Sequence, residues 1–284
     1  MLEDITRSLV RRALAEDLGG YGDVTSQATV PAELRGKAHI VAREELVVCG
    51  LPLAAAVMGA VDPRADFNAL LRDGSLTADG EVVAAIEGPV RSLLMAERTM
   101  LNFLSHMSGV ATQSRRFAQA VEGTGATVVD TRKTTPGLRQ WEKQAVIHGG
   151  CGNHRFGLFD LVLIKNNHLT AAGGVREAVR RAQKAAPHYL RIEVEVESAD
   201  DLREAVAAGA DIIMLDNQTV DDLRELVALA RELKPDVILE ASGGVTLETV
   251  RAVAETGVDI ISTSAITMGA PSADLSLTLL PAIV

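Results

Sequence analysis

The stretch LRIEVEVESADDLREAVAAGADIIMLDN, residues 190–217, decides the fold class of this chain. It opens with β-branched residues, continues through an Ala- and Leu-rich helical pattern at 199–208, and ends in a second apolar run at 211–217. Two strands separated by a helix of this length form a βαβ unit, in which the strands pair in parallel.

The same rhythm continues along the chain after Gly109. Short apolar runs begin at residues 126, 161, 190, 211, 237 and 258. Helical stretches lie at 174–186, 199–208, 219–233 and 246–256. Six strands of this kind are too few for a complete eight-stranded barrel. We therefore predict an α/β fold with an irregular, incomplete α/β barrel, and the pattern alone also allows an open doubly wound sheet.

The first part of the chain has a different pattern. The runs GKAHIVAREELVVCG (36–50) and GEVVAAIEGPV (80–90) are typical of antiparallel strands bounded by turn residues. A helical pattern follows over 90–108, with Pro89 at its start. We predict an N-terminal α/β sandwich domain over residues 1–110 and a barrel domain over 111–271. The C-terminal tail, 272–284, is expected to pack back on the first domain.

Composition excludes several classes of function. The net charge of −10 argues against general nucleic-acid binding, which needs a basic face. The two cysteines provide neither a disulfide framework nor a metal-ligand spacing, so a reducing, cytoplasmic location is expected. The N-terminus is typical of an amphipathic helix instead of a signal peptide, and no apolar run reaches the roughly 18 residues that span a bilayer. We expect a soluble protein with neither a nucleic-acid nor a membrane partner.

Polar residues follow every predicted strand of the barrel. In α/β barrels the reactive groups lie at these C-terminal strand ends. The groups in chain order are Asp130-Thr131-Arg132-Lys133, Lys165-Asn166-Asn167-His168, Glu195 with Glu197, Asp216-Asn217, Ser242-Gly243-Gly244 and Ser262-Thr263-Ser264. Helix capping explains single short polar residues, but it does not explain a series that includes Arg, Lys and Glu. The series indicates a site for a charged small molecule.

The run IEVEVE at 192–197 alternates apolar residues with glutamates. In isolation this pattern is typical of an antiparallel strand with one solvated face, but helices cover the outer face of a barrel strand. The glutamates should then point inward, where carboxylates need cations or hydroxyl donors. Glu195 together with Asp216 could hold Mg²⁺ or ribose hydroxyls.

The last two strands carry a phosphate-binding pattern. Ser242-Gly243-Gly244 precedes a predicted helix start, and ISTSAITMGA (261–270) forms a second loop of small residues. The candidate cations are Arg98, Arg132, Lys133, His154, Arg155 and Lys165. On pattern alone, Arg98 is a surface residue paired with Glu97 or solvent. We interpret His106, His148 and His168 as structural residues because their spacing matches no metal motif.

Eight ordered segments of the chain resemble the quinolinate phosphoribosyltransferase family, also called nicotinate-nucleotide pyrophosphorylase (carboxylating). They are EDLGGYGDVTS (16–26), AERTMLNFLSHMSGVAT (96–112), DTRKTTPGLRQWEKQAV (130–146), GNHRFGLFDLVLIKNNH (152–168), EVEVES (193–198), IIMLDN (212–217), EASGGVT (240–246) and GVDIIST (257–263). The resemblance implies an N-terminal sandwich and an irregular barrel. It also implies transfer of phosphoribosyl from phosphoribosyl pyrophosphate to quinolinate, giving nicotinate mononucleotide, pyrophosphate and CO₂ for NAD biosynthesis.

The resemblance also implies roles for individual residues. Arg132, Lys133, His154, Arg155 and Lys165 match the cationic pocket for the quinolinate dicarboxylate, and Thr131 is a further expected substrate-binding residue. Glu195 and Asp216 match the acidic pair for ribose and Mg²⁺, and with Lys133 they are the expected catalytic residues. Ser242, Gly243, Gly244, Thr263, Ser264 and Ala265 match the 5′-phosphate site. Arg98 matches an arginine supplied by the neighbouring subunit of a homodimer, with further assembly left open.

Three positions depart from the pattern of this family. Asn166 stands where aspartate is usual, Ser264 where glycine is common, and Met268 where histidine is frequent. The alternatives are a paralogue associated with molybdenum transport, a non-catalytic phosphate-ligand binder, and a nicotinate or nicotinamide phosphoribosyltransferase. The intact NHR and LIKNNH segments disfavour the paralogue, the acidic pair disfavours the passive binder, and the surplus of cations disfavours the third alternative.

Overall fold

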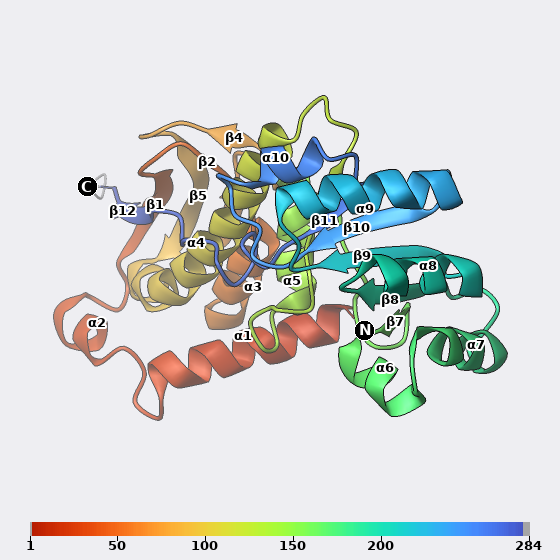
Figure 1. Cartoon of the computed structure of the whole chain (residues 1–284). Coiled ribbons are helices and arrows are strands. Elements are labelled where there is room, and N and C mark those ends of the chain that lie inside the picture. The colour runs from red at the N-terminus through yellow and green to blue at the C-terminus, as the bar shows by residue number, and fades with distance from the viewer. Residues whose placement is uncertain (1, 281–284) are drawn as a thin grey trace. The chain divides into compact units, whose positions relative to one another are not determined.

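The structure is a computed structural model that describes residues 2–280 (Figure 1). The chain divides into two compact units, and each is treated separately below. The first unit comprises the described residues of 1–114, 136–149 and 270–284, and the second comprises 115–135 and 150–269. Residues 136–149 belong to the first unit, although the sequence pattern assigned them to the barrel domain.

The first unit is built on an antiparallel sheet of four strands in the order β12-β1-β5-β3. These strands are β1 (Arg35–Ala42), β3 (Asp66–Ala69), β5 (Val82–Pro89) and β12 (Leu275–Leu279). A separate antiparallel pair joins β2 (Leu46–Val47) to β4 (Leu76–Thr77). Alternate residues of β1, namely Ala38, Ile40 and Ala42, are fully buried, as expected for a strand with one face on a core.

The sheet pairs a strand from the C-terminal part of the chain with a strand from its N-terminal part. β12 pairs with β1 over the register Ala38↔Leu279 to Ala42↔Leu275. Residues 281–284 of the expected tail lie outside the described part of the chain. The helices of this unit are α1 (Leu2–Leu18), α2 (Val24–Thr29), α3 (Leu51–Val61), most of α4 (Val90–Ala120) and α5 (Arg139–His148).

Helix α4 is longer than its sequence pattern predicts. The expected end at residue 108 is wrong because the helix continues through Gly109. A Cβ atom at Gly109 would lie 2.0 Å from the carbonyl oxygen of Pro271, so the missing side chain permits a close approach of the chain at that point. Glycine serves packing here, and it does not end the helix.

The second unit contains a parallel sheet of six strands in the order β6-β11-β10-β9-β8-β7. The strands are β6 (Thr127–Val129), β7 (Val162–Ile164), β8 (Ile192–Val196), β9 (Ile212–Asp216), β10 (Ile238–Ser242) and β11 (Ile260–Ser262). The helices are α6 (Asn166–Ala172), α7 (Val175–Ala185), α8 (Ala199–Ala208), α9 (Val220–Leu233) and α10 (Val250–Ala254). Figure 1 shows α7, α8 and α9 side by side along one face of this sheet.

These two units confirm the predicted fold class. β6 and β7 are the edges of the six-stranded sheet in the described chain, so the barrel is incomplete. The central strands follow each other in sequence order, which is typical of a barrel and not of a doubly wound sheet.

Strand β8 shows why the sequence pattern of this unit is so regular. Ile192, Val194 and Val196 are buried on one face, and Glu193 and Glu195 are buried on the other. The expectation that Glu197 also points inward is wrong. It lies one residue past the end of β8 and is exposed.

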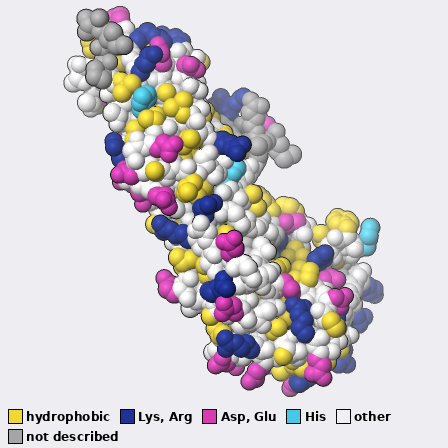
Figure 2. Space-filling view, turned by 90° about the horizontal axis from the view of Figure 1, so that it is seen from above, with side chains coloured by type: hydrophobic (Ala, Val, Ile, Leu, Met, Phe, Trp, Pro, Cys, Tyr) yellow, Lys and Arg dark blue, Asp and Glu magenta, His cyan; other side chains and the backbone are white. Residues whose placement is uncertain are grey.

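No helix within residues 2–280 is long and apolar enough to cross a membrane. On the face that Figure 2 shows, Lys and Arg side chains are interspersed with Asp and Glu side chains. This face therefore carries charges of both signs.

Candidate active site

A pocket of about 740 Å³ lies at the C-terminal ends of the strands of the second unit. Its walls include residues at or just beyond all six strands. Arg132 follows the edge strand β6 and Lys165 follows the opposite edge strand β7, yet both line the same pocket. The sheet therefore curls until its two edges face a common space.

Fourteen of the fifteen residues predicted to bind substrate line this pocket. They are Thr131, Arg132, Lys133, His154, Arg155, Lys165, Glu195, Asp216, Ser242, Gly243, Gly244, Thr263, Ser264 and Ala265. The fifteenth, Arg98, does not line the pocket. It is an exposed residue of α4 in the first unit.

The loop after β6 is held by hydrogen bonds to its backbone. The Lys133 amide donates to Thr131 Oγ1 at 3.0 Å, and Thr267 Oγ1 donates to the Lys133 carbonyl at 2.9 Å. Thr267 follows β11, the neighbour of β6 in the sheet. The position of Lys133 is thus set by two strand ends, which prepares its side chain for a ligand.

Two guanidinium groups lie near each other at the pocket. The Nη1 atom of Arg155 donates a hydrogen bond to the Leu161 carbonyl at 3.1 Å, which fixes the Arg155 side chain. Burial lowers the pKa of Arg155, and the positive charge of Arg132 lowers it further. Because both groups stay charged in proteins, a ligand with negative charge would relieve their repulsion.

His154 faces two buried carboxylates at the wall of the pocket. Its Nε2 atom lies 3.2 Å from Glu193 Oε2 and 3.2 Å from Glu240 Oε2. Its Nδ1 atom lies 2.7 Å from the amide nitrogen of Arg155, and its Nε2 atom faces the carboxylates. The Asp130 carboxylate accepts the His154 amide at 2.9 Å and fixes the backbone.

This trio retains a proton at neutral pH. Burial lowers the pKa of His154, but the contacts with Glu193 and Glu240 outweigh burial and raise it to about 10. Burial also raises the pKa of Glu193, whose Oε1 atom has no hydrogen-bond partner among the described residues. Both shifts favour a proton held between the imidazole and the carboxylates.

An acidic pair occupies the neighbouring strands β8 and β9. The Lys165 ammonium donates to Glu195 Oε2 at 2.8 Å. Burial raises the pKa of Asp216, and the negative charge of Glu195 raises it further. A cation between these carboxylates would lower that repulsion, so their oxygen atoms suit Mg²⁺, which prefers oxygen ligands.

Two loops of small residues close the pocket after β10 and β11. Gly243 has φ +98°, and a Cβ atom there would lie 2.2 Å from Asn217 Oδ1. The Ala265 amide donates to Thr263 Oγ1 at 3.1 Å, while Thr263 Oγ1 donates to the Val245 carbonyl at 2.9 Å. Only glycine permits the close approach at residue 243, which keeps the loop backbone open to an anion.

Comparisons with known proteins identify the protein family of this chain. The N-terminal domain profile of "Quinolinate phosphoribosyl transferase" matches residues 23–108, and its C-terminal domain profile matches residues 110–278. The chain belongs to the quinolinate phosphoribosyltransferase family. The predicted resemblance is thereby confirmed along nearly the whole sequence.

Relatives of this quinolinate phosphoribosyltransferase family member come from several bacteria. The chain is 43% identical over 264 residues to a probable nicotinate-nucleotide pyrophosphorylase (carboxylating) of Synechocystis, covering 93% of this chain and 89% of the relative. It is 42% identical over 278 residues to the Mycobacterium leprae enzyme of that name, covering 97% and 98%. The solved Francisella tularensis nicotinate-nucleotide pyrophosphorylase superposes with a TM-score of 0.92 at 40% identity, covering 98% of this chain and 96% of that one.

Another solved structure shows the fold alone. Human nicotinic acid phosphoribosyltransferase superposes with a TM-score of 0.67 at 14% identity, covering 91% of this chain and 72% of that one.

The sequence pattern assigned no individual role to several residues in or beside the quinolinate phosphoribosyltransferase pocket. The carboxylates of Glu193 and Glu240 contact His154 Nε2, and Asn217 packs closely against Gly243. The pocket is also lined by Leu163, Met214, Val245, Thr246, Ser262 and Gly269. Glu240 had a detectable signal, because a glutamate inside an apolar strand resembles the case of Glu193. Asn217 had a weaker one, since an asparagine tolerates the positive φ of 53° that it adopts after β9.

Of the three departures from the family pattern, Ser264 lies in the pocket lining and Asn166 and Met268 do not. The Asn166 side chain, at the start of α6, donates to the Glu197 carboxylate. An aspartate there would face Glu197 with a second negative charge. Ser264 lines the pocket, whereas Met268 is exposed and does not.

Proposed function

We propose that the pocket of the second unit joins quinolinate to phosphoribosyl pyrophosphate and releases CO₂ and pyrophosphate. The activity follows from the family: the chain is a pentosyltransferase with quinolinate phosphoribosyltransferase activity, which forms nicotinate mononucleotide in NAD biosynthesis. Our proposal concerns the roles of individual residues, the metal ion and the assembly.

One observation carries the assignment of the substrate site. Cationic side chains from both edges of the sheet line the same pocket as the carboxylates of Glu195 and Asp216. Quinolinate has two carboxylates and needs cations, whereas a ribose that loses pyrophosphate develops positive charge and needs anions. The cationic side chains and the two carboxylates of the pocket match these opposite requirements.

The cationic side chains of the pocket bind the dicarboxylate. Arg132 and Arg155 can each hold a carboxylate with two parallel hydrogen bonds, and Lys133 and Lys165 add compact charges. His154 lies beside Arg155, with the Nε2 atom of its ring toward Glu193 and Glu240. These contacts orient the ring nitrogen of quinolinate toward the ribose, which supplies a proximity effect.

The acidic pair, Glu195 and Asp216, and the two small-residue loops bind the phosphoribosyl group. Backbone amides of Gly243 and Gly244 suit the 5′-phosphate, the hydroxyl groups of Ser242 and Ser264 offer further contacts, and Ala265 belongs to the same pair of loops. Glu195 and Asp216 face the ribose and stabilise positive charge as the bond from C1′ to pyrophosphate breaks.

Mg²⁺ fits the acidic pair, since both Glu195 and Asp216 offer oxygen atoms. Burial and then the charge of Glu195 raise the pKa of Asp216, and a cation would offset both effects. When bound, Mg²⁺ would supply positive charge for the departing pyrophosphate. Lys133, which lines the same pocket, supplies positive charge of the same kind.

The second half of the reaction needs no protein nucleophile. The ring nitrogen forms its bond to C1′ as pyrophosphate leaves, and the ring then carries positive charge. The bond from the ring to the adjacent carboxylate breaks to give CO₂, its electron pair remains on the ring carbon, and that carbon takes up a proton. The chain's residues hold the ring in place while this happens.

Arg98 completes the site in a homodimer. It lies outside the pocket of its own chain and is exposed on α4, so a second subunit is the proposed source of this cation. A cytoplasmic location agrees with two cysteines that form no disulfide bond, while some plant relatives are named as mitochondrial.

Product formation tests the proposal. Purified protein with Mg²⁺ and phosphoribosyl pyrophosphate is given quinolinate or nicotinate, and nicotinate mononucleotide and CO₂ are measured. We expect product with quinolinate only. Product from nicotinate alone would instead support a nicotinate phosphoribosyltransferase. The absence of product from both would favour the molybdenum-associated paralogue or a non-catalytic binder.

A further inference from the structure

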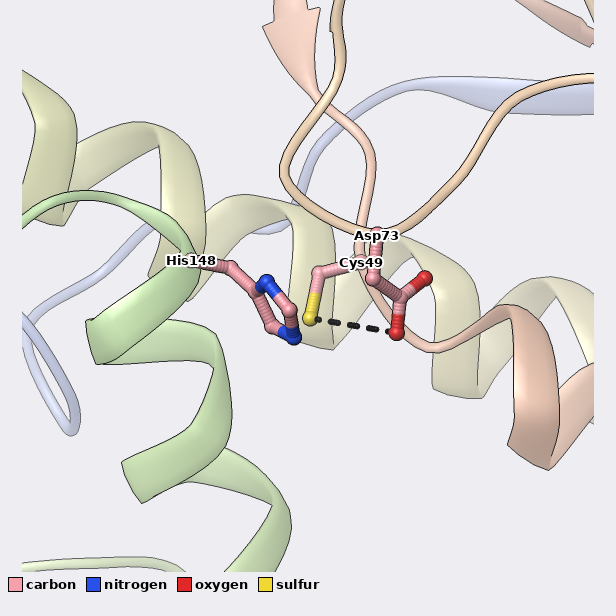
Figure 3. Close-up of side chains that lie close together, drawn as sticks. All are labelled: Cys49, Asp73 and His148. Atoms are coloured by element: carbon pink, nitrogen blue, oxygen red, sulfur yellow. Dashed lines mark hydrogen bonds between the residues drawn. The ribbon is translucent and has the colours of Figure 1, made fainter.

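Three side chains in the first unit converge on a point that plays no part in the proposed reaction. They are Cys49, Asp73 and His148, and one ligand atom from each lies within 4.8 Å of the other two. Figure 3 shows the Cys49 thiol between the His148 ring and the Asp73 carboxylate. None of the three lines the pocket of the second unit.

We propose that Cys49, Asp73 and His148 form a site for one zinc ion, with its fourth position open to water. Tetrahedral zinc binds sulfur at about 2.3 Å and nitrogen or oxygen at about 2.0 Å, which sets the sulfur about 3.5 Å from each other ligand atom and the nitrogen about 3.3 Å from the oxygen. The Cys49 Sγ atom already lies 3.8 Å from Asp73 Oδ2. A closer approach of Asp73 by a few tenths of an ångström and a rotation of the exposed His148 side chain would complete the geometry.

Contacts around the cluster hold two of the ligands in place. The Cys49 amide donates to Ser108 Oγ at 3.0 Å, and Ser108 Oγ donates back to the Cys49 carbonyl at 3.2 Å. Asp73 Oδ1 accepts the amide of Leu51, the first residue of α3, at 3.1 Å. The remaining oxygen, Oδ2, is thereby turned toward the thiol. Such outer contacts orient ligands in metal sites.

The donor set selects the kind of ion. A thiolate and an imidazole favour zinc and related transition metals over Mg²⁺, which prefers oxygen alone. On binding, the thiol proton leaves to solvent as the sulfur–zinc bond forms. A thiolate, a carboxylate and a neutral imidazole then balance the two positive charges of zinc. A nucleophilic role fits less well, because reactive thiolates lie in electropositive surroundings and Asp73 is an anion.

Sequence spacing gave no sign of this site, since the three residues are widely separated along the chain. Cys49 follows β2, Asp73 precedes β4, and His148 is the last residue of α5. Pairing of β2 with β4 brings the first two together. The inclusion of residues 136–149 in the first unit brings the third.

Cobalt(II) titration of the full-length protein, without substrate or Mg²⁺, tests the proposal independently of the phosphoribosyl reaction. Cobalt in this site should produce a sulfur-to-metal charge-transfer band in the near ultraviolet, and one equivalent of zinc should remove it. The band should be lost in Cys49→Ser. It should persist in Cys151→Ser, which removes the chain's other buried cysteine, located in the second unit.

His148→Ala keeps the test decisive if Cys49→Ser fails to fold, because His148 is exposed. Zinc affinity, measured by competition with a chelator, should fall at least about 100-fold, since loss of an outer contact alone typically costs 10–100-fold. His188→Ala, which removes another exposed histidine, should leave the affinity unchanged. The absence of a band in the unmodified protein, or an unchanged zinc affinity in His148→Ala, would overturn the proposal.

Discussion

The ammonium group of Lys165 donates a 2.8 Å hydrogen bond to the carboxylate of Glu195 across the neighbouring strands β7 and β8. The Glu195 side chain is 8% exposed and that of Lys165 is 48% exposed. Parallel pairing of Ile164 with Val194 places the two strand ends at the same level. Glu195 is therefore an oriented, largely desolvated carboxylate at the pocket wall, as electrostatic stabilisation of a cationic transition state requires.

Removal of either catalytic charge should reduce turnover without unfolding the protein. We expect Glu195→Ala and Lys133→Ala each to lower kcat about 10²–10³-fold, the usual effect of deleting one electrostatic contact to a transition state. Steady-state kinetics with quinolinate measure the loss, and circular dichroism checks the fold. Lys184→Ala and Glu232→Ala remove the same charges from exposed positions of α7 and α9 and should leave kcat unchanged. Near-normal turnover in both Glu195→Ala and Lys133→Ala would refute the role assignment.

Mixing of two inactive variants tests whether Arg98 serves the neighbouring subunit. Arg98→Ala and Lys133→Ala should each be nearly inactive alone. In mixed dimers one site receives an intact Lys133 from its own chain and an intact Arg98 from the other. Random re-association of equal amounts should restore about a quarter of the sites, because half of the dimers are mixed and each has one intact site. If activity stays at the level of the separate variants, Arg98 does not act across a subunit interface.

The loop after β10 should depend on the absence of a side chain at Gly243. In Gly243→Ala the new Cβ atom would meet Asn217 Oδ1 at 2.2 Å, and φ +98° disfavours alanine as well. We expect a higher KM for phosphoribosyl pyrophosphate and a lower melting temperature. Gly123→Ala is the matched control, since φ +79° disfavours alanine there while no atom lies within 4 Å. Strain at such a φ costs about 1–3 kcal/mol, so equal changes in both variants would mean that the clash is unimportant.

The trio of His154, Glu193 and Glu240 should make stability depend on pH. The pKa of His154 is raised from 6.5 to about 10 in the folded protein, which therefore holds the proton more strongly than the unfolded chain does. The resulting stabilisation is fully present below about pH 6.5 and is lost as pH rises toward 10. We expect the free energy of unfolding to fall across this range by an amount on the order of a few kcal/mol.

Denaturant unfolding at a series of pH values measures this slope. The double variant with Glu193→Gln and Glu240→Gln removes both carboxylates and should flatten it. A control with Glu204→Gln and Glu225→Gln, both exposed on helices, should keep the slope of the unmodified protein. If the slope survives removal of both buried carboxylates, the trio is not its source.

The local sequence was sufficient for the repeated parts of the fold. Strands and helices of the second unit alternate because apolar residues recur at intervals that suit each element, and this pattern is local. The polar residues at the strand ends were equally readable, because parallel strands place their C-terminal ends at one edge of a sheet. Fourteen pocket residues were found in this way and through the family resemblance.

Other features depend on contacts between residues far apart in the chain. The sequence pattern predicted a helix over 90–108, but α4 continues through Gly109, whose backbone lies close to Pro271. Residues 136–149 carry an ordinary helical pattern that gives no information about the unit to which they belong. Glu240 and Glu193 are separated by 47 positions, and only the sheet brings both to His154.

The sequence by itself thus determined the class of fold, the family and the chemical character of the pocket, because periodicity and motifs are properties of short segments. Tertiary structure alone decided which charges meet: Arg155 beside Arg132, Glu195 beside Lys165, and the cluster of Cys49, Asp73 and His148. The physical reason is that electrostatic and metal-binding energies depend on distances of a few ångströms, and the folded backbone sets those distances.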